Sequence, residues 1–173
     1  MIRKLSLKEL CVFSMLGVIM FCSKLILDAL PNIHLIGALI VSYTVAFRTR
    51  ALVPIYVFVF LSGIYGGFML WWVPYLYIWT VLWAVTMILP KKMPKAVAVI
   101  VYIAVCSLHG LLFGTLYAPF QALAFGLDWD AIIAWIIAGL PFDVIHAISN
   151  ALVGILIVPI SSLLIKLDKN IIK

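Results

Sequence analysis

The feature that most constrains this chain is a series of long apolar runs that recurs from one end to the other. Hydrophobic residues make up 67% of its 173 positions and charged residues 10%, which is more apolar side chain than a water-soluble domain can cover. Apolar runs of about 20 residues cross the hydrocarbon core of a bilayer as helices. The sequence therefore predicts an all-α polytopic membrane protein, with a single integral membrane domain over residues 1–173.

The charged residues indicate the topology. Except for Lys24, the basic residues lie before the first apolar run, in two short connections, or after the last run: Arg3, Lys4, Lys8, Arg48, Arg50, Lys91, Lys92, Lys95, Lys166, Lys169 and Lys173. The alternate connections carry Asp28, Asp128 and Asp130. Because cytoplasmic loops are enriched in lysine and arginine, both termini are predicted to be cytoplasmic. The net charge of +6 is thus assigned to membrane topology and not to nucleic-acid binding.

Six membrane-spanning helices are predicted, over residues of about 7–29, 34–47, 51–66, 72–89, 94–113 and 141–165. The first carries Lys24 and Asp28 without a following small-residue cleavage site, so it is expected to be a retained span. As one helix, residues 131–165 would be roughly 52 Å long, well above a hydrocarbon core of about 30 Å. A break is therefore expected near Gly139, Leu140 and Pro141, which would make residues 131–139 an interfacial or re-entrant segment. Residues 114–130 are expected to form an outer connection, with Pro119 and Gly126 interrupting it.

The last apolar run contains three polar residues, Asp143, His146 and Asn150. At about 100° per residue they lie within an arc of roughly 60° on one helix face. Polar groups are costly in lipid, so this face is expected to meet protein or water. Two interpretations remain open: the stripe forms one wall of a ligand pocket, or it hydrogen-bonds neighbouring helices to each other.

The fourth span is rich in aromatic residues, and Trp72, Tyr75 and Trp79 share one of its faces. Tryptophan and tyrosine commonly form belts at the membrane boundary, and such a belt would explain the position of Trp72. Trp79 is expected to lie deeper in the membrane. The three side chains could instead stack on a flat ligand, and both interpretations remain open.

Small residues predict close approaches between helices. Gly110 and Gly114 form a GxxxG pattern in an apolar helix, and Ser14 and Gly17 lie on one face of the first span. His109, beside the GxxxG face, is expected to hydrogen-bond across helices.

Several kinds of chemistry have no matching residues in this sequence. It contains no GxxxxGK[ST] phosphate-binding loop and neither a GxSxG nor an HExxH motif. Its three histidines and one intramembrane carboxylate are too scattered to predict a metal site, and its three cysteines have no CxxC spacing. Neither a metal nor a cofactor is therefore expected, and ATP hydrolysis through such a loop is excluded.

Three segments together resemble the substrate-binding S components of energy-coupling factor vitamin transporters: "ALPNIHLIGALIV" (29–41), "GFMLWWVPYLYIWTVLW" (67–83) and "GLPFDVIHAISNALVGILIVP" (139–159). The first is similar to the family's loop and second span, and the third to its last helix. The second resembles the aromatic third loop and fourth span of the cobalamin-type branch. Many members carry an AxxxA coupling motif in the first span, where this chain has Ser14 and Gly17, so the docking face is not assigned.

The resemblance implies a non-enzymatic subunit that binds a vitamin or precursor at the outer face of a bacterial plasma membrane. It also implies delivery inward together with a transmembrane coupling subunit and two cytoplasmic ATPase subunits. Carried onto this chain, the ligand-binding residues are Asn32, His34, Trp72, Tyr75, Trp79, Asp143, His146 and Asn150. Aromatic, amide, imidazole and carboxylate groups together suit a cobalamin-type or flat heteroaromatic ligand.

Two other functions remain open. The chain could be a small intramembrane enzyme using His109, Asp143 and His146, provided that these groups come within hydrogen-bonding reach of one reacting atom. Alternatively, it could be a packing or assembly protein whose polar stripe only joins helices.

Overall fold

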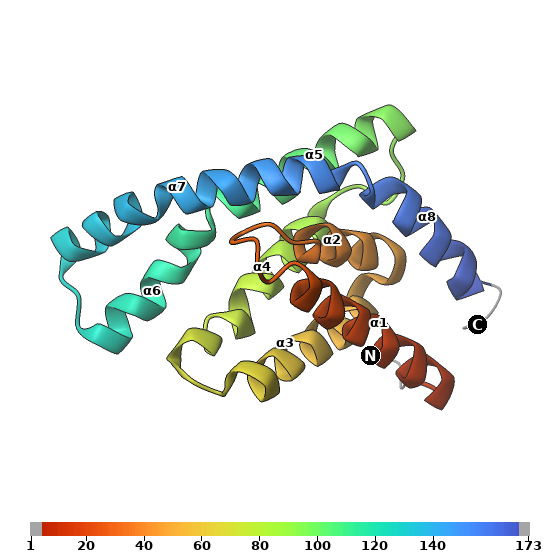
Figure 1. Ribbon diagram of the computed structural model, residues 1–173. Coiled ribbons are helices and arrows are strands. Elements are labelled where there is room, and N and C mark those ends of the chain that lie inside the picture. Colours follow the sequence, from red (N-terminus) through yellow and green to blue (C-terminus); the bar gives the residue numbers. More distant parts are fainter. Residues whose placement is uncertain (1–4, 170–173) are drawn as a thin grey trace.

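The computed structural model describes residues 5–169, and within this range the chain is helical without any β-strand (Figure 1). This confirms the predicted all-α class. Arg3, Lys4 and Lys173, used above for the topology, lie outside the described residues. The elements are α1 (Leu7–Ile26), α2 (Ile36–Phe47), the 3₁₀ turn η1 (Arg48–Ala51), α3 (Leu52–Gly66), the 3₁₀ turn η2 (Leu70–Trp72), α4 (Tyr75–Ile88), α5 (Lys95–Leu111), α6 (Phe113–Phe125), α7 (Trp129–Gly154) and α8 (Ile157–Leu167).

Five helical stretches among the described residues are long and apolar enough to cross a membrane, and α8 is a shorter apolar helix. One of the five joins α2, η1 and α3, which the sequence analysis counted as two spans. Figure 1 shows the chain turning back at η1, so the two helices run in different directions. With 12 residues, α2 is about 18 Å long and shorter than the hydrocarbon core.

The central helix of the bundle is α2. It packs against α1, α4, α5, α7 and α8, and every residue from 36 to 44 is buried. Its polar side chains satisfy their hydroxyls locally: Ser42 donates to the carbonyl of Ala38 and Thr44 to that of Ile40, both over 2.7 Å. A helix that is apolar on all sides belongs in the interior, and this explains the position of α2.

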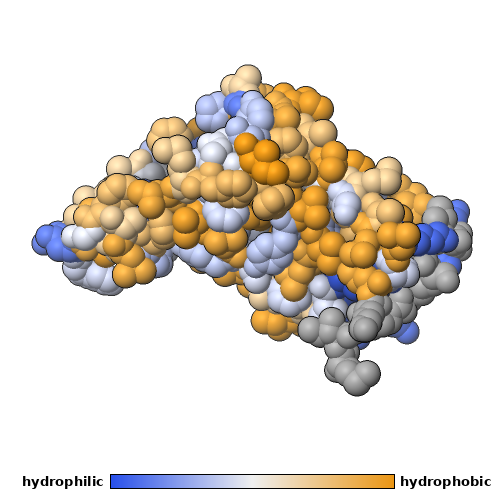
Figure 2. Space-filling model, turned by 90° about the horizontal axis from the view of Figure 1, so that it is seen from below, coloured by the Kyte–Doolittle hydropathy of each residue, from blue (hydrophilic) through white to orange (hydrophobic). Residues whose placement is uncertain are grey.

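The outer surface is also apolar. Large hydrophobic side chains are exposed along α1, α3, α5 and α7, for example Ile19, Phe60, Ile100 and Ile148. Figure 2 shows apolar residues over most of the face it presents, with the most hydrophilic residues at the margins. An apolar exterior around a packed interior is the arrangement expected of a multi-pass membrane protein, whose helices face lipid.

The predicted break in the last apolar segment is wrong in its position. Helix α7 runs without interruption through Gly139, Leu140 and Pro141, ends at Gly154, and is followed by α8 from Ile157. The residues before the predicted break are therefore part of α7 and not a separate interfacial segment.

The two prolines of this segment explain the difference. Pro159 has no N–H, so it leaves the carbonyl of Ile155 without its usual helical partner, close to the observed boundary. Around Pro141, the two carboxylate oxygens of Asp143 share the single backbone N–H of Gly114, which holds α7 against α6. Prolines inside membrane helices are tolerated where neighbouring elements stabilise the surrounding turns.

The prediction of a connection interrupted at Pro119 after the fifth span is wrong as well. Most of this segment forms α6, separated from α5 by Leu112 alone, and Pro119 lies inside the helix. In an apolar segment within a membrane, the backbone N–H and C=O groups cannot hydrogen-bond to water. They must bond to each other, which favours a helix. The helix ends at Gly126, whose left-handed φ of 64° is the usual helix-terminating conformation of glycine.

A charged cluster joins the two ends of the chain. Arg50 in η1 donates to Glu9 on α1 over 2.8 Å and to Asp168, just after α8, over 2.9 Å. Its guanidinium also lies 5.7 Å from the ring centroid of Phe13. The sequence analysis treated Arg50 only as a loop charge, but in the structure this residue connects three elements.

Candidate functional site

A pocket of ≈ 170 Å³ opens between the α1–α2 connection, the start of α4, the α5–α6 junction and α7. Four of the predicted ligand-binding residues line it: Asn32, His34, Tyr75 and His146. The structure thus brings together residues that are separated by up to about a hundred positions in the sequence.

The α1–α2 connection forms one side of the pocket through two tight turns. The amide of Leu30 donates to the carbonyl of Leu27 over 2.9 Å, and that of Ile33 to Leu30 over 3.1 Å. Asn32 adopts a φ of 59°, a left-handed conformation that asparagine tolerates better than most residues. This local geometry places His34 directly before the first turn of α2.

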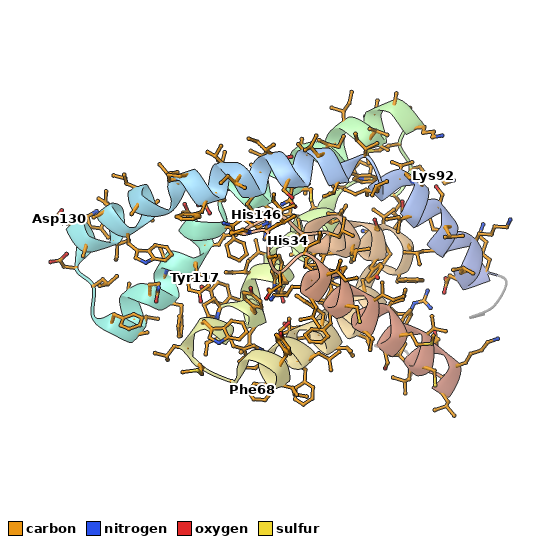
Figure 3. All side chains as sticks on the ribbon, viewed as in Figure 1. His34, Phe68, Lys92, Tyr117, Asp130 and His146 are labelled. Atoms are coloured by element: carbon orange, nitrogen blue, oxygen red, sulfur yellow. The ribbon has the colours of Figure 1, made fainter. Side chains whose placement is uncertain are left out.

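The three histidines of the chain form one cluster, in which His34 and His109 contact Trp79 and His146 contacts His34. The ring centroids of His34 and His146 are 4.6 Å apart, and Trp79 lies 6.2 Å from His34 and 5.8 Å from His109. Figure 3 shows His34 and His146 side by side at the centre of the bundle. Phe113 completes the cluster, 5.1 Å from His146.

Several polar atoms in this cluster are buried without a hydrogen-bond partner among the described residues. Both ring nitrogens of His146 are in this state, as are Nδ1 of His34 and Nε1 of Trp79. His109 is satisfied at one nitrogen only: its Nε2 lies 3.1 Å from the carbonyl oxygen of Ile78, and its Nδ1 has no partner among the described residues. Buried polar groups in proteins normally have partners, so the exceptions mark positions that need an explanation.

Burial also determines the charge of His34, which in the structure lies before α2 and so before the membrane-spanning stretch that begins at Ile36. It lowers the pKa of His34 to about 4, well below the ordinary value of 6.5. The imidazole is therefore neutral at physiological pH and offers one donor and one acceptor.

Asp143 lies outside the pocket and holds two helices together. Both carboxylate oxygens are 3.1 Å from the backbone nitrogen of Gly114, in the first turn of α6. A carboxylate is favourable there because the amides of a helix N-terminus carry partial positive charge. Asp143 thus stabilises the junction between α5 and α6.

Asn150 is buried between three helices. Its side-chain amide donates to the carbonyl of Cys106 on α5 over 2.9 Å, and its oxygen faces Gly37 on α2. The polar stripe of α7 therefore divides: Asp143 and Asn150 contact neighbouring helices, and His146 between them lines the pocket.

The three aromatic residues Trp72, Tyr75 and Trp79 also have different surroundings. Tyr75 lines the pocket and packs on Trp79, with ring centroids 5.4 Å apart. Trp72 lies in η2, where its indole N–H donates to the carbonyl of Val59 over 2.7 Å and its ring packs on Phe68. The structure places Trp72 outside the pocket, in the contact between η2 and α3.

The predicted small-residue faces meet different surroundings. A Cβ added at Gly110 would lie 3.0 Å from the backbone of His146, and one added at Gly17 would lie 2.6 Å from Val57 on α3. Ser14 is exposed and does not share the buried side of α1. Gly17 and Gly110 therefore permit close helix contacts.

Two charged residues and one aromatic residue of the pocket were not assigned to the site from the sequence. Lys24 and Asp28 form an ion pair of 3.2 Å within α1 and its end, and both line the pocket. Phe113 also lines it. In the sequence, Phe113 lies one helical turn after His109, and this position could have indicated a place beside it. The helix is interrupted at Leu112, however, so the two residues do not belong to one continuous helix.

No group of three or more histidine, cysteine, aspartate or glutamate side chains is arranged to hold a metal ion within residues 5–169. In comparisons with known proteins, no family, no curated protein and no solved structure matches this chain.

Proposed function

We propose that this protein is the membrane-embedded binding subunit of a vitamin importer of the energy-coupling factor type. It captures a small heteroaromatic vitamin or precursor in the pocket around His34 and His146. Release to the cytoplasm requires a transmembrane coupling subunit and two ATPase subunits. In this proposal the chain is not an enzyme.

The observation that carries the proposal is the state of His146. Its side chain is 1% exposed, both ring nitrogens lack partners among the described residues, and it still lines the pocket. Leaving a buried polar group unsatisfied costs about 1–3 kcal/mol. A ligand group that hydrogen-bonds to one of these nitrogens would remove part of this cost when it binds.

The size of the pocket favours a compact ligand. Its ≈ 170 Å³ is below the roughly 300–1,000 Å³ typical of sites for drug-sized molecules. The rings of Tyr75 and Phe113 along its wall suit the face or edge of a planar heterocycle. Of the two ligand classes considered, these dimensions support a single heteroaromatic ring system more than a corrin.

The alternative functions receive less support from the geometry. An enzyme using Asp143 with the histidines would need its carboxylate directed toward them, but both oxygens contact Gly114. A role in packing explains Asp143 and the side-chain nitrogen of Asn150, and it leaves both ring nitrogens of His146 without an explanation. Ligand binding is the function that would use His146, whose ring nitrogens make no hydrogen bond in helix packing.

Equilibrium titration of the purified full chain in detergent tests the proposal, with riboflavin, pyridoxine and cobalamin as the probes. The readout is intrinsic fluorescence, because Trp79 lies next to the histidines of the pocket. We expect saturable 1:1 binding of at least one heteroaromatic probe. His146→Ala should weaken it about tenfold or more, as expected for the loss of buried hydrogen bonds.

Trp72→Phe is the matched control, since this aromatic residue lies outside the pocket. Its affinity should stay within about twofold of the unchanged protein. Because the pKa of His34 is about 4, affinity should stay constant from about pH 8 to 5 and decrease as the pH approaches 4. If no probe binds at micromolar concentration, the proposal fails.

A further inference from the structure

A second hollow lies near the basic end of the bundle. Two adjoining cavities of ≈ 210 Å³ and ≈ 470 Å³ share Val45, Lys91, Tyr102 and Ile165, and together they form one groove. The groove runs between α2, the end of α4, the start of α5 and α8. Figure 3 shows Lys92, which lines it, at the end of the molecule opposite to Asp130.

The groove has charge of one sign only. Arg48, Lys91, Lys92 and Lys95 line it, and none of the six acidic residues of the chain does. The three lysines form no ion pair within the part of the chain that the structure describes. Their ammonium groups are therefore available to an anion.

Arg48 is held in place by the protein itself. Its backbone adopts a φ of 57°, and its carbonyl accepts a hydrogen bond of 3.1 Å from the indole of Trp83. Its guanidinium donates to the carbonyl of Met87 at the end of α4. Arg48 thus contributes a positioned positive charge, and the lysines provide the adaptable ones.

Backbone dipoles also favour an anion in this groove. Helix α5 begins at Lys95 after Pro94, which has no side-chain group to cap the first amides. The N-terminus of a helix carries partial positive charge and favours anions. The hydroxyl of Tyr102 provides a further donor in the groove.

The walls of the groove are apolar below this cluster of charges. Val45, Ala98, Val158 and Ile165 line it. A ligand with an anionic head and hydrocarbon chains would match both the basic cluster and the apolar lining. A soluble anion would use only the basic cluster.

We propose that this groove binds an anionic phospholipid, with its phosphate among Lys91, Lys92, Lys95 and Arg48 and its acyl chains against the apolar lining between α2, α5 and α8. Basic pockets between membrane helices are a general means of binding acidic lipid headgroups. The proposal is independent of the proposed vitamin binding, because the groove and the pocket share no residue.

Native mass spectrometry of the delipidated full chain in a neutral detergent tests this inference. The probes are phosphatidylglycerol, phosphatidylcholine with the same acyl chains, and inorganic phosphate. We expect phosphatidylglycerol to bind at least tenfold more tightly than phosphatidylcholine, and inorganic phosphate not to displace it at equal concentration. The double variant Lys91→Gln/Lys92→Gln should lose about 30-fold in affinity, from the contribution of two basic residues near a lipid headgroup.

The matched control is Lys8→Gln/Lys166→Gln, which removes two exposed lysines that do not line the groove. It should retain the affinity for phosphatidylglycerol within about threefold. Equal weakening in both double variants would overturn the proposal in favour of non-specific attraction. Competition by inorganic phosphate at equal concentration, or equal binding of both lipids, would also overturn it.

Discussion

At the scale of single residues, the polar groups of α7 have different tasks although they share one helix face. Asp143 accepts a backbone hydrogen bond from α6, Asn150 donates to α5, and His146 has no partner among the described residues. Spacing alone could not separate them, because the partners of each lie on other helices. The packing roles belong to the two residues whose side chains reach a neighbouring backbone.

The contact between Asp143 and Gly114 can be measured with a double-mutant cycle. Asp143→Ala removes the acceptor of a buried amide and should lower the free energy of unfolding by about 1–3 kcal/mol. Gly114→Ala adds a Cβ only 2.6 Å from the carboxylate and should also destabilise the protein. The double variant should lose clearly less than the sum, because the clash disappears with the carboxylate.

Thermal unfolding in detergent provides the readout for this cycle. Asp143→Asn serves as the control, because it retains a carbonyl oxygen at the same place and should lose less than Asp143→Ala. Additive losses, within about 0.5 kcal/mol, would show that the two residues do not interact.

At the scale of elements, close contacts between helices depend on which side of each helix is buried. Gly17 of α1 lies against Pro54 and Val57 of α3, whereas Ser14, one turn earlier, is exposed. Three residues along a helix correspond to about 300°, so neighbouring turns can differ in burial at the edge of a contact face. The predicted small-residue face was therefore partly buried and partly exposed.

This difference leads to a prediction with a matched pair on one helix. Gly17→Val places its side chain into Val57 and should reduce the free energy of unfolding by about 1–3 kcal/mol or more. Ser14→Val introduces the same side chain at an exposed position and should change it by no more than about 0.5 kcal/mol. Equal effects of both variants on detergent unfolding would contradict the observed packing of α1 on α3.

At the scale of the whole molecule, the charges separate toward the ends of the bundle. Figure 1 shows α6 and the first part of α7 extending away from the other helices, and Asp128 and Asp130 lie at the turn between them. The basic groove with Lys92 lies at the opposite end. Lys24 and Asp28 lie at the mouth of the candidate pocket.

Cysteine labelling of intact cells tests the orientation predicted from these charges. Cys11, Cys22 and Cys106 are first replaced by alanine, and single cysteines are then introduced as Asp130→Cys and Lys92→Cys. Because basic connections are expected to face the cytoplasm, a membrane-impermeant maleimide should label the first variant and not the second. The second should react only after the cells are permeabilised, and the reverse pattern would contradict the orientation.

Much of the fold follows from local sequence. The helices around Leu7–Ile26, Ile36–Phe47 and Lys95–Leu111 agree with predicted spans to within a few residues, since apolar runs and flanking charges mark them. The errors concern α6 and the course of α7 past Pro141. Both depend on contacts between α6 and α7 that a local proline rule cannot include.

The helical class, the membrane character and a set of candidate residues follow from local sequence, because they depend on composition and on periodicity within one segment. Only the tertiary structure decided that His34, Tyr75 and His146 share a pocket and that Asp143 and Trp72 do not. The physical reason is that a polar group buried between helices takes its role from the partner it meets, and that partner lies on another helix.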